Sequence, residues 1–145
     1  MSGSKSRGFS RSGRDNEEDK SIKLAFYKTQ ISLTNGILTT VKGWVSALIR
    51  EQGNINSYIE DWATQKVIYD SNENLSEVVI TNVFEGVCAD TIKTELADCI
   101  TIMEQTCSDA STLSADLTLQ IAKLNEYIAQ LNSQLTSLNY QMSLL

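Results

Sequence analysis

The chain has 145 residues, of which 41% are hydrophobic and 21% charged, and its formal net charge is −6. It contains no histidine and no proline, so catalytic designs that need an imidazole are excluded and no proline interrupts a long helix. The length fits a single domain, the composition is that of a folded chain, and no stretch is apolar enough for a membrane span.

The chain begins with a basic segment. Lys5, Arg7, Arg11 and Arg14 give the first 14 residues a charge of +4, while the remainder of the chain carries −10. Serine and glycine fill most other positions here, so we expect residues 1–20 to form a disordered tail. The four bases are a candidate electrostatic arm for nucleic acid, an acidic surface or an export machine, and a solvated terminus without a partner is the alternative.

Two further expectations concern this tail. The acidic remainder of the chain repels phosphate, so nucleic acid is the less favoured partner. No apolar segment follows the bases, so the sequence predicts no Sec-type signal peptide. The sequence does not decide whether the protein is cytoplasmic, part of a virion or exported by a route other than Sec.

An N-terminal helical region is expected over residues 21–87. Its first helix, of about 30 residues, follows apolar side chains in alternating three- and four-residue steps. Ile37, Trp44 and Ile49 widen this stripe, which favours packing against more than one neighbour. Gly53 is the predicted end of the helix. The stripe consists of Leu24, Tyr27, Ile31, Leu38, Val41, Val45 and Leu48, with Thr34 in its one polar slot.

Small residues recur on another face of this helix, at Ser32, Gly36, Gly43 and Ala47. Each interior glycine costs about 1 kcal/mol relative to alanine. Close approach of a second backbone would offset that cost, so we interpret the four positions as a close-packing face. Local bending of the helix is the alternative.

The rest of the N-terminal region is less regular. Residues 54–70 are expected to form a shorter helix, because Ser57 and Glu60 have capping-box spacing, and residues 71–74 a turn. Residues 75–87 could be a helix or a short β-strand. We favour the helix, because the chain offers no convincing second strand.

The strongest pattern is a heptad repeat in the C-terminal segment, residues 88–145. Nine apolar residues follow steps of four and three, which is typical of a coiled coil. The same phase extends backwards through smaller residues, so one helix from about residue 90 would be about 84 Å long. The nine residues, which we interpret as an oligomerisation seam, are Leu117, Ile121, Leu124, Ile128, Leu131, Leu135, Leu138, Met142 and Leu145.

No charged residue follows Glu126, which indicates that the end of the chain is enclosed in a larger assembly. The expected partner is the chain itself, in a homo-oligomer or polymer, or a helix of another chain. Alternatively the seam packs on the first helix as an antiparallel hairpin, and both can hold together. The predicted fold is therefore all-α, an elongated helical hairpin or bundle with a long C-terminal coiled-coil helix.

The sequence predicts no catalytic, cofactor-binding or metal-binding residue, and hence no enzyme. Cys88, Cys99 and Cys107 form no CxxC pair and have no histidine to complete a zinc site, so we interpret them as buried small hydrophobic residues. The glycines form no phosphate-binding motif, and adjacent carboxylates such as Glu60 and Asp61 fit a solvated helix face.

We therefore expect a non-enzymatic structural subunit that self-assembles into a helical polymer or filament through coiled-coil packing. The first alternative is a coiled-coil adaptor in a hetero-oligomeric complex. The second is a viral coat protein or nucleoprotein that uses the basic tail on nucleic acid.

The layout also resembles that of bacterial type III secretion filament and needle subunits. The resemblance lies in the serine-rich start at 2–12, the amphipathic helix at 24–48 and the polar-flanked coil at 117–145. It implies export in an unfolded state and polymerisation outside the cell, with the helices packed in the wall of a tube.

Overall fold

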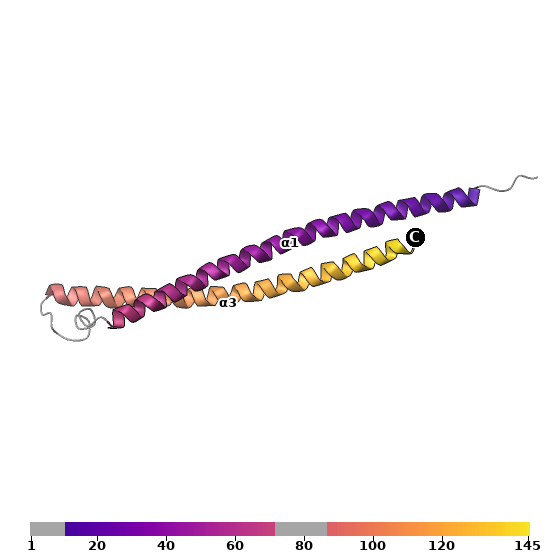
Figure 1. The fold of residues 1–145 in the computed structure, drawn as a ribbon. Coiled ribbons are helices and arrows are strands. Elements are labelled where there is room, and N and C mark those ends of the chain that lie inside the picture. Colours follow the sequence, from indigo (N-terminus) through magenta and orange to yellow (C-terminus); the bar gives the residue numbers. More distant parts are fainter. Residues whose placement is uncertain (1–10, 72–86) are drawn as a thin grey trace, which may run out of the picture. The chain divides into compact units, whose positions relative to one another are not determined.

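The computed structural model describes residues 11–71 and 87–145, and they form two long helices (Figure 1). Helix α1 spans Arg11–Ser71 and has 61 residues, and helix α3 spans Val87–Ser143 and has 57 residues. All described residues except the last two are helical, so the predicted all-α class is confirmed. Most of the ambiguous segment 75–87 lies outside the described residues, as do the tail bases Lys5 and Arg7.

Helix α1 begins earlier than expected. It starts at Arg11, so the predicted disorder is wrong for residues 11–20. The acidic residues at 15–19 lie in the early turns, where negative charge stabilises a helix. Lys23 Nζ also lies 2.7 Å from Asp19 Oδ2, one turn away, and this ion pair raises the pKa of Lys23. Local charge pairing therefore supports helix in a segment whose side chains are exposed.

The predicted helix end at Gly53 is also wrong, because α1 runs through this residue to Ser71. The segment expected to be a separate helix, 54–70, is the continuation of α1. The physical reason is that the heptad phase of the first helix continues without a break through Gln52, Ile55 and Ile59. Contacts on both sides of Gly53 thus hold the glycine in a helix that it would otherwise terminate.

One heptad line on α1 is shielded from solvent along most of the helix. Its members are half-buried or buried, whereas most of the other described residues of α1 are exposed. The line contains two unexpected polar members, Gln52 and Lys66. Its members are Tyr27, Ile31, Thr34, Leu38, Val41, Val45, Leu48, Gln52, Ile55, Ile59, Trp62, Lys66 and Tyr69.

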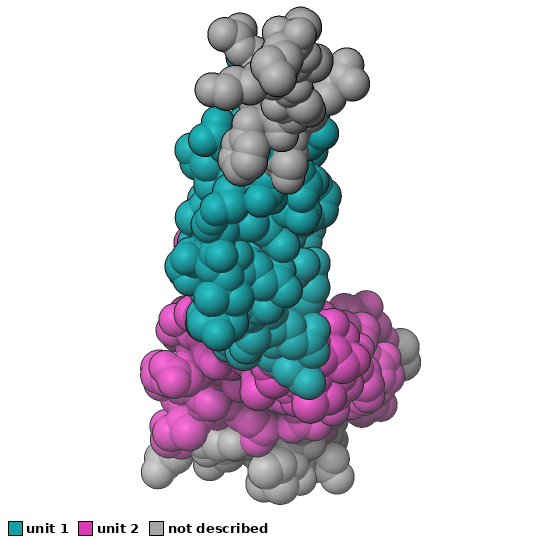
Figure 2. All heavy atoms as spheres, turned by 90° about the vertical axis from the view of Figure 1, so that its right-hand side faces the viewer, with its two compact units in different colours: residues 1–44, 124–145 teal, residues 45–123 magenta. Residues whose placement is uncertain are grey.

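The chain divides into two compact units, each of which combines part of α1 with part of α3 (Figure 2). Unit 1 comprises residues 1–44 and 124–145, and unit 2 comprises residues 45–123. In unit 1 the two helices lie side by side (Figure 1). Its core is formed by Thr34, Leu38 and Val41 of α1 and Leu131 of α3, of which Val41 is 2% exposed.

The contact between the helices of unit 2 is more polar. The Gln52 amide Nε2 donates hydrogen bonds to the Ser114 carbonyl at 2.8 Å and to Thr118 Oγ1 at 2.6 Å. Ser114 Oγ donates to Asn56 Oδ1 at 2.7 Å, and Lys66 lies 3.9 Å from Glu104 Oε1. Higher numbers on α1 meet lower numbers on α3, so the helix segments of this unit are antiparallel.

We predict that Gly53→Ala raises the free energy of unfolding by about 1 kcal/mol, because alanine favours the helix interior. A Cβ added at Gly53 would meet no atom within 4 Å, so the methyl group fits without strain. Urea denaturation monitored by circular dichroism measures the change. A loss of stability would instead indicate that the helix ends at Gly53.

We predict that Leu131→Ala lowers the free energy of unfolding by about 2–5 kcal/mol, because Leu131 is 4% exposed and its truncation leaves a cavity. The matched control is Leu144→Ala, since Leu144 is 67% exposed. The same denaturation experiment compares them. Equal losses in the two variants would contradict the assignment of Leu131 to the core.

Candidate assembly interface

In unit 1, α1 carries a second line of side chains with heptad spacing, beside the line that packs within the chain. The line runs through Phe26, Gln30, Leu33, Ile37, Thr40 and Trp44. Leu33, Ile37 and Trp44 are 57%, 45% and 57% exposed. The sequence predicted a second neighbour from Ile37 and Trp44, and the described part of the chain does not supply it. A large apolar strip is therefore uncovered.

A hollow of about 500 Å³ lies on this strip. Gly36 leaves room for it, since a Cβ there would meet no atom within 4 Å. The Thr40 hydroxyl donates to the Gly36 carbonyl at 3.1 Å, so its O–H donor is used inside the helix. The lining is Ser32, Leu33, Gly36, Ile37, Thr40, Val41, Trp44 and Tyr127. We call six of its exposed members the open face, namely Leu33, Gly36, Ile37, Thr40, Trp44 and Tyr127.

The two sides of unit 1 differ in charge. Tyr127 of α3 lines the hollow together with residues of α1, so it lies on the side of the open face. Gln134 and Gln141 have the same heptad position as Tyr127 and lie on the same side. No charged residue lies on this side between Phe26 and Trp44 of α1, and none follows Glu126 in α3. The opposite side, which we call the polar side, carries exposed Lys28, Asn35 and Lys42 of α1 and Asn125, Asn132 and Asn139 of α3.

The predicted seam lies on the shielded face of α3. All nine residues, from Leu117 to Leu145, are half-buried or buried, although no other chain is present. Leu131, at 4% exposed, is the most buried of them. The apolar surface of the seam is thus largely used within the chain, as in the hairpin alternative. A role of the seam in oligomerisation stays a prediction.

The predicted close-packing face is open in unit 1. Ser32, Gly36 and Gly43 are exposed, while Ala47, which belongs to unit 2, is half-buried. A Cβ at Gly36 or Gly43 would meet no atom within 4 Å, so no second backbone in the described part of the chain approaches these glycines. Close packing here stays a prediction for a second chain.

The structure offers little for other kinds of site. Arg14 is exposed near the start of α1, and the electrostatic role of Lys5, Arg7, Arg11 and Arg14 is untested. Within residues 11–71 and 87–145, no three His, Cys, Asp or Glu side chains gather as a metal site would need. Neither described helix has a stretch long and apolar enough to cross a bilayer.

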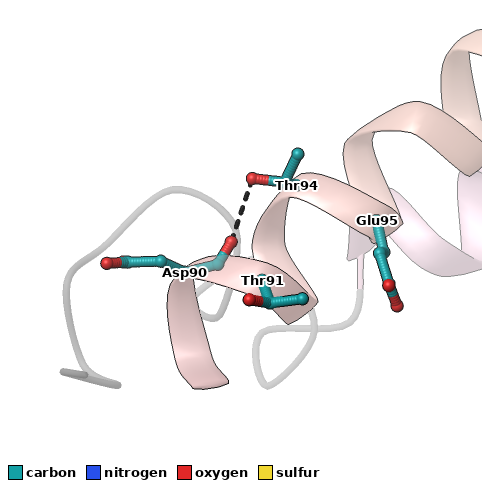
Figure 3. A pocket seen from close by; sticks show the side chains of 4 residues that line it. All are labelled: Asp90, Thr91, Thr94 and Glu95. Carbon is teal, nitrogen blue, oxygen red and sulfur yellow. Dashed lines mark hydrogen bonds between the residues drawn. The ribbon is translucent and has the colours of Figure 1, made fainter. Parts of the chain in front are cut away.

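A second hollow lies at the start of α3. It is lined by Asp90, Thr91, Thr94 and Glu95, all of them exposed (Figure 3). The Thr94 hydroxyl donates to the Asp90 carbonyl at 2.9 Å, and the two carboxylates point in different directions. These side chains do not form the positioned pair that acid–base chemistry needs.

Comparison of the chain with known protein families, with curated proteins and with solved structures gives no match. The function is therefore inferred from the geometry of unit 1. Sequence reasoning grouped Thr39 or Thr40 with Ser32 and Gly36, but it missed Leu33 and Tyr127 as members of the same surface. Their signal was present, because Leu33, Ile37, Thr40 and Trp44 follow steps of four, three and four residues.

The cysteines differ in their surroundings. Cys99 is exposed, so its predicted burial is wrong, whereas Cys107 lies half-buried on the shielded face of α3. Desolvation raises the pKa of the Cys107 thiol above its ordinary value. The Cys88 side chain lies outside the described residues.

We predict that iodoacetamide alkylates Cys107 several-fold more slowly than Cys99 near pH 8, because less Cys107 is accessible thiolate. The difference between the two alkylation rates should become smaller as the pH rises through the raised pKa of Cys107. Peptide mapping by mass spectrometry separates the sites. Equal rates in the folded protein, with urea-unfolded protein as the control, would contradict the placement of Cys107.

Proposed function

We propose that this protein is a non-enzymatic structural subunit that self-assembles, through helix–helix packing, into a helical polymer or filament. The observation that carries the proposal is the open face. Leu33, Ile37 and Trp44 are each about half exposed on one helix strip, and full burial of a large apolar side chain is worth about 1.5–3 kcal/mol. A partner that covers this strip gains the share of that free energy that corresponds to the exposed half of each side chain.

The spacing of the open face favours a helical partner. Leu33, Ile37, Thr40 and Trp44 keep the step pattern with which coiled-coil helices contact each other. The lack of charge on this side favours a neutral partner over nucleic acid, since phosphate recognition depends on basic side chains. The chain itself supplies such neutral helices.

Two further observations support assembly. The C-terminal 19 residues carry no charge, which suits enclosure better than a solvated surface. The layout resemblance to type III secretion filament and needle subunits favours the same kind of function. Export and packing in a tube wall are part of that proposal.

The test compares two double variants of the full chain that add the same charge. Ile37→Lys with Trp44→Lys places two lysines on the open face, and Asn35→Lys with Asn132→Lys places two on the polar side. We expect the wild type and the polar-side variant to assemble and the open-face variant to sediment as a monomer, because a buried unpaired charge is costly.

Sedimentation velocity measures assembly, negative-stain microscopy identifies filaments, and circular dichroism checks that the helices persist. A wild-type protein that stays monomeric at all concentrations would overturn self-assembly. If that monomer assembles only with a second, different protein, the adaptor function replaces the proposed one.

A further inference from the structure

We propose that the open face binds the same face of a second copy of this chain, in antiparallel orientation about a two-fold axis at Thr40. This inference rests on the proposed self-assembly and specifies its first contact. A two-fold contact requires a surface that is complementary to itself. The order of large and small residues around Thr40 meets that requirement.

In a two-fold antiparallel pair centred on Thr40, a residue that follows Thr40 lies opposite the one that precedes it by the same number of positions. Trp44 of one copy then lies opposite Gly36 of the other, and Ile37 lies opposite Gly43. Each pair joins an exposed large side chain to a glycine beside which a Cβ would meet no atom within 4 Å. The large residues of each copy thus find space in the other.

The hollow supplies this space beside Gly36. It has a volume of about 500 Å³ and is lined by Gly36 together with Ser32, Ile37 and Thr40. The Thr40 hydroxyl is already bonded to the Gly36 carbonyl, so contact at the axis leaves no unpaired hydroxyl. The largely apolar Trp44 indole of a second copy is compatible with the largely apolar lining of this hollow. An added charged group is not.

The distribution of charge favours the open face over the polar side as the contact between two copies. The open face carries no charge between Phe26 and Trp44, so two copies meet there without like-charge repulsion. The polar side carries Lys28 and Lys42 with no acidic residue between them on α1. Two copies that met through the polar side would bring like charges together.

The available area fits a weak contact that is repeated in an assembly. With the axis at Thr40 the contact extends equally in both directions, and residues 33–47 rise about 21 Å along α1, while two packed helices are about 20 Å wide. A contact over this surface buries about 400 Å² per copy, or about 800 Å² in total, which is the size of a weak or transient interface. The two-fold contact closes on itself, so filament growth uses another face of the dimer.

Cysteine cross-linking tests the axis. In a full-length background with Cys88, Cys99 and Cys107 replaced by serine, Thr40→Cys places one thiol at the axis in each copy. We expect mild oxidation to convert most of this variant to a disulfide-linked dimer, because identical residues at the axis are neighbours. The control is Asn35→Cys on the polar side, which should stay monomeric in denaturing electrophoresis.

A second pair of variants tests the hollow. Gly36→Leu fills it, whereas Gly53→Leu adds the same side chain to an exposed position of α1 outside the open face. Both sites have room for a Cβ, so both variants should keep their helix content by circular dichroism. We expect Gly36→Leu to raise the dimer dissociation constant by about tenfold or more and Gly53→Leu to leave it unchanged.

The outcomes separate this inference from the proposed function. If the wild type never assembles, self-assembly itself fails. If the wild type assembles but Asn35→Cys cross-links as well as Thr40→Cys, or Gly36→Leu assembles as tightly as Gly53→Leu, the two-fold contact is wrong and self-assembly stands.

Discussion

The narrow apolar contact between α1 and α3 in unit 1 determines what the rest of the molecule can do. Val41 and Leu131 are its most buried members. Once this heptad line faces inward, the rotation of each helix about its own axis is fixed. Leu33, Ile37 and Trp44, which lie beside that line, must then face outward. The core therefore creates the open face, because a pair of helices can shield only one stripe of each helix.

The heptad spacing is the same in both units, but the residues that form the contact between the helices differ. The contact in unit 1 is apolar, whereas Gln52, Asn56, Ser114 and Thr118 form a hydrogen-bonded cluster in unit 2. Polar groups in such a contact contribute little net stability but define which residues pair. Unit 1 has eight basic and five acidic residues, a formal charge of +3, while unit 2 has four and thirteen, or −9. The neutral open face thus lies in the unit with the smaller charge.

The sequence was sufficient to predict the all-α class, and its heptad spacing marked the residues that form the shielded face of α3. It did not decide whether that face packs within the chain or against a second copy. It was insufficient at Gly53. A glycine there predicts the end of the helix, but the heptad spacing of α1 continues through Gln52 and past this glycine. It also failed at residues 11–20, where acidic residues in the early turns and the Asp19–Lys23 ion pair support a helix whose side chains are exposed. The open face was predicted only through Ile37 and Trp44. Its extent depends on which of two heptad lines of α1 packs against α3, and spacing alone does not choose between them.

Trp44 is exposed in the protomer, and we expect it to become buried when copies assemble. Replacement of Trp62 by phenylalanine leaves Trp44 as the sole tryptophan, so its fluorescence reports on the open face alone. The emission maximum should shift to shorter wavelength as protein concentration rises, in step with the mass measured by light scattering. An emission maximum that stays at its exposed value while the mass increases would show that assembly does not use the open face.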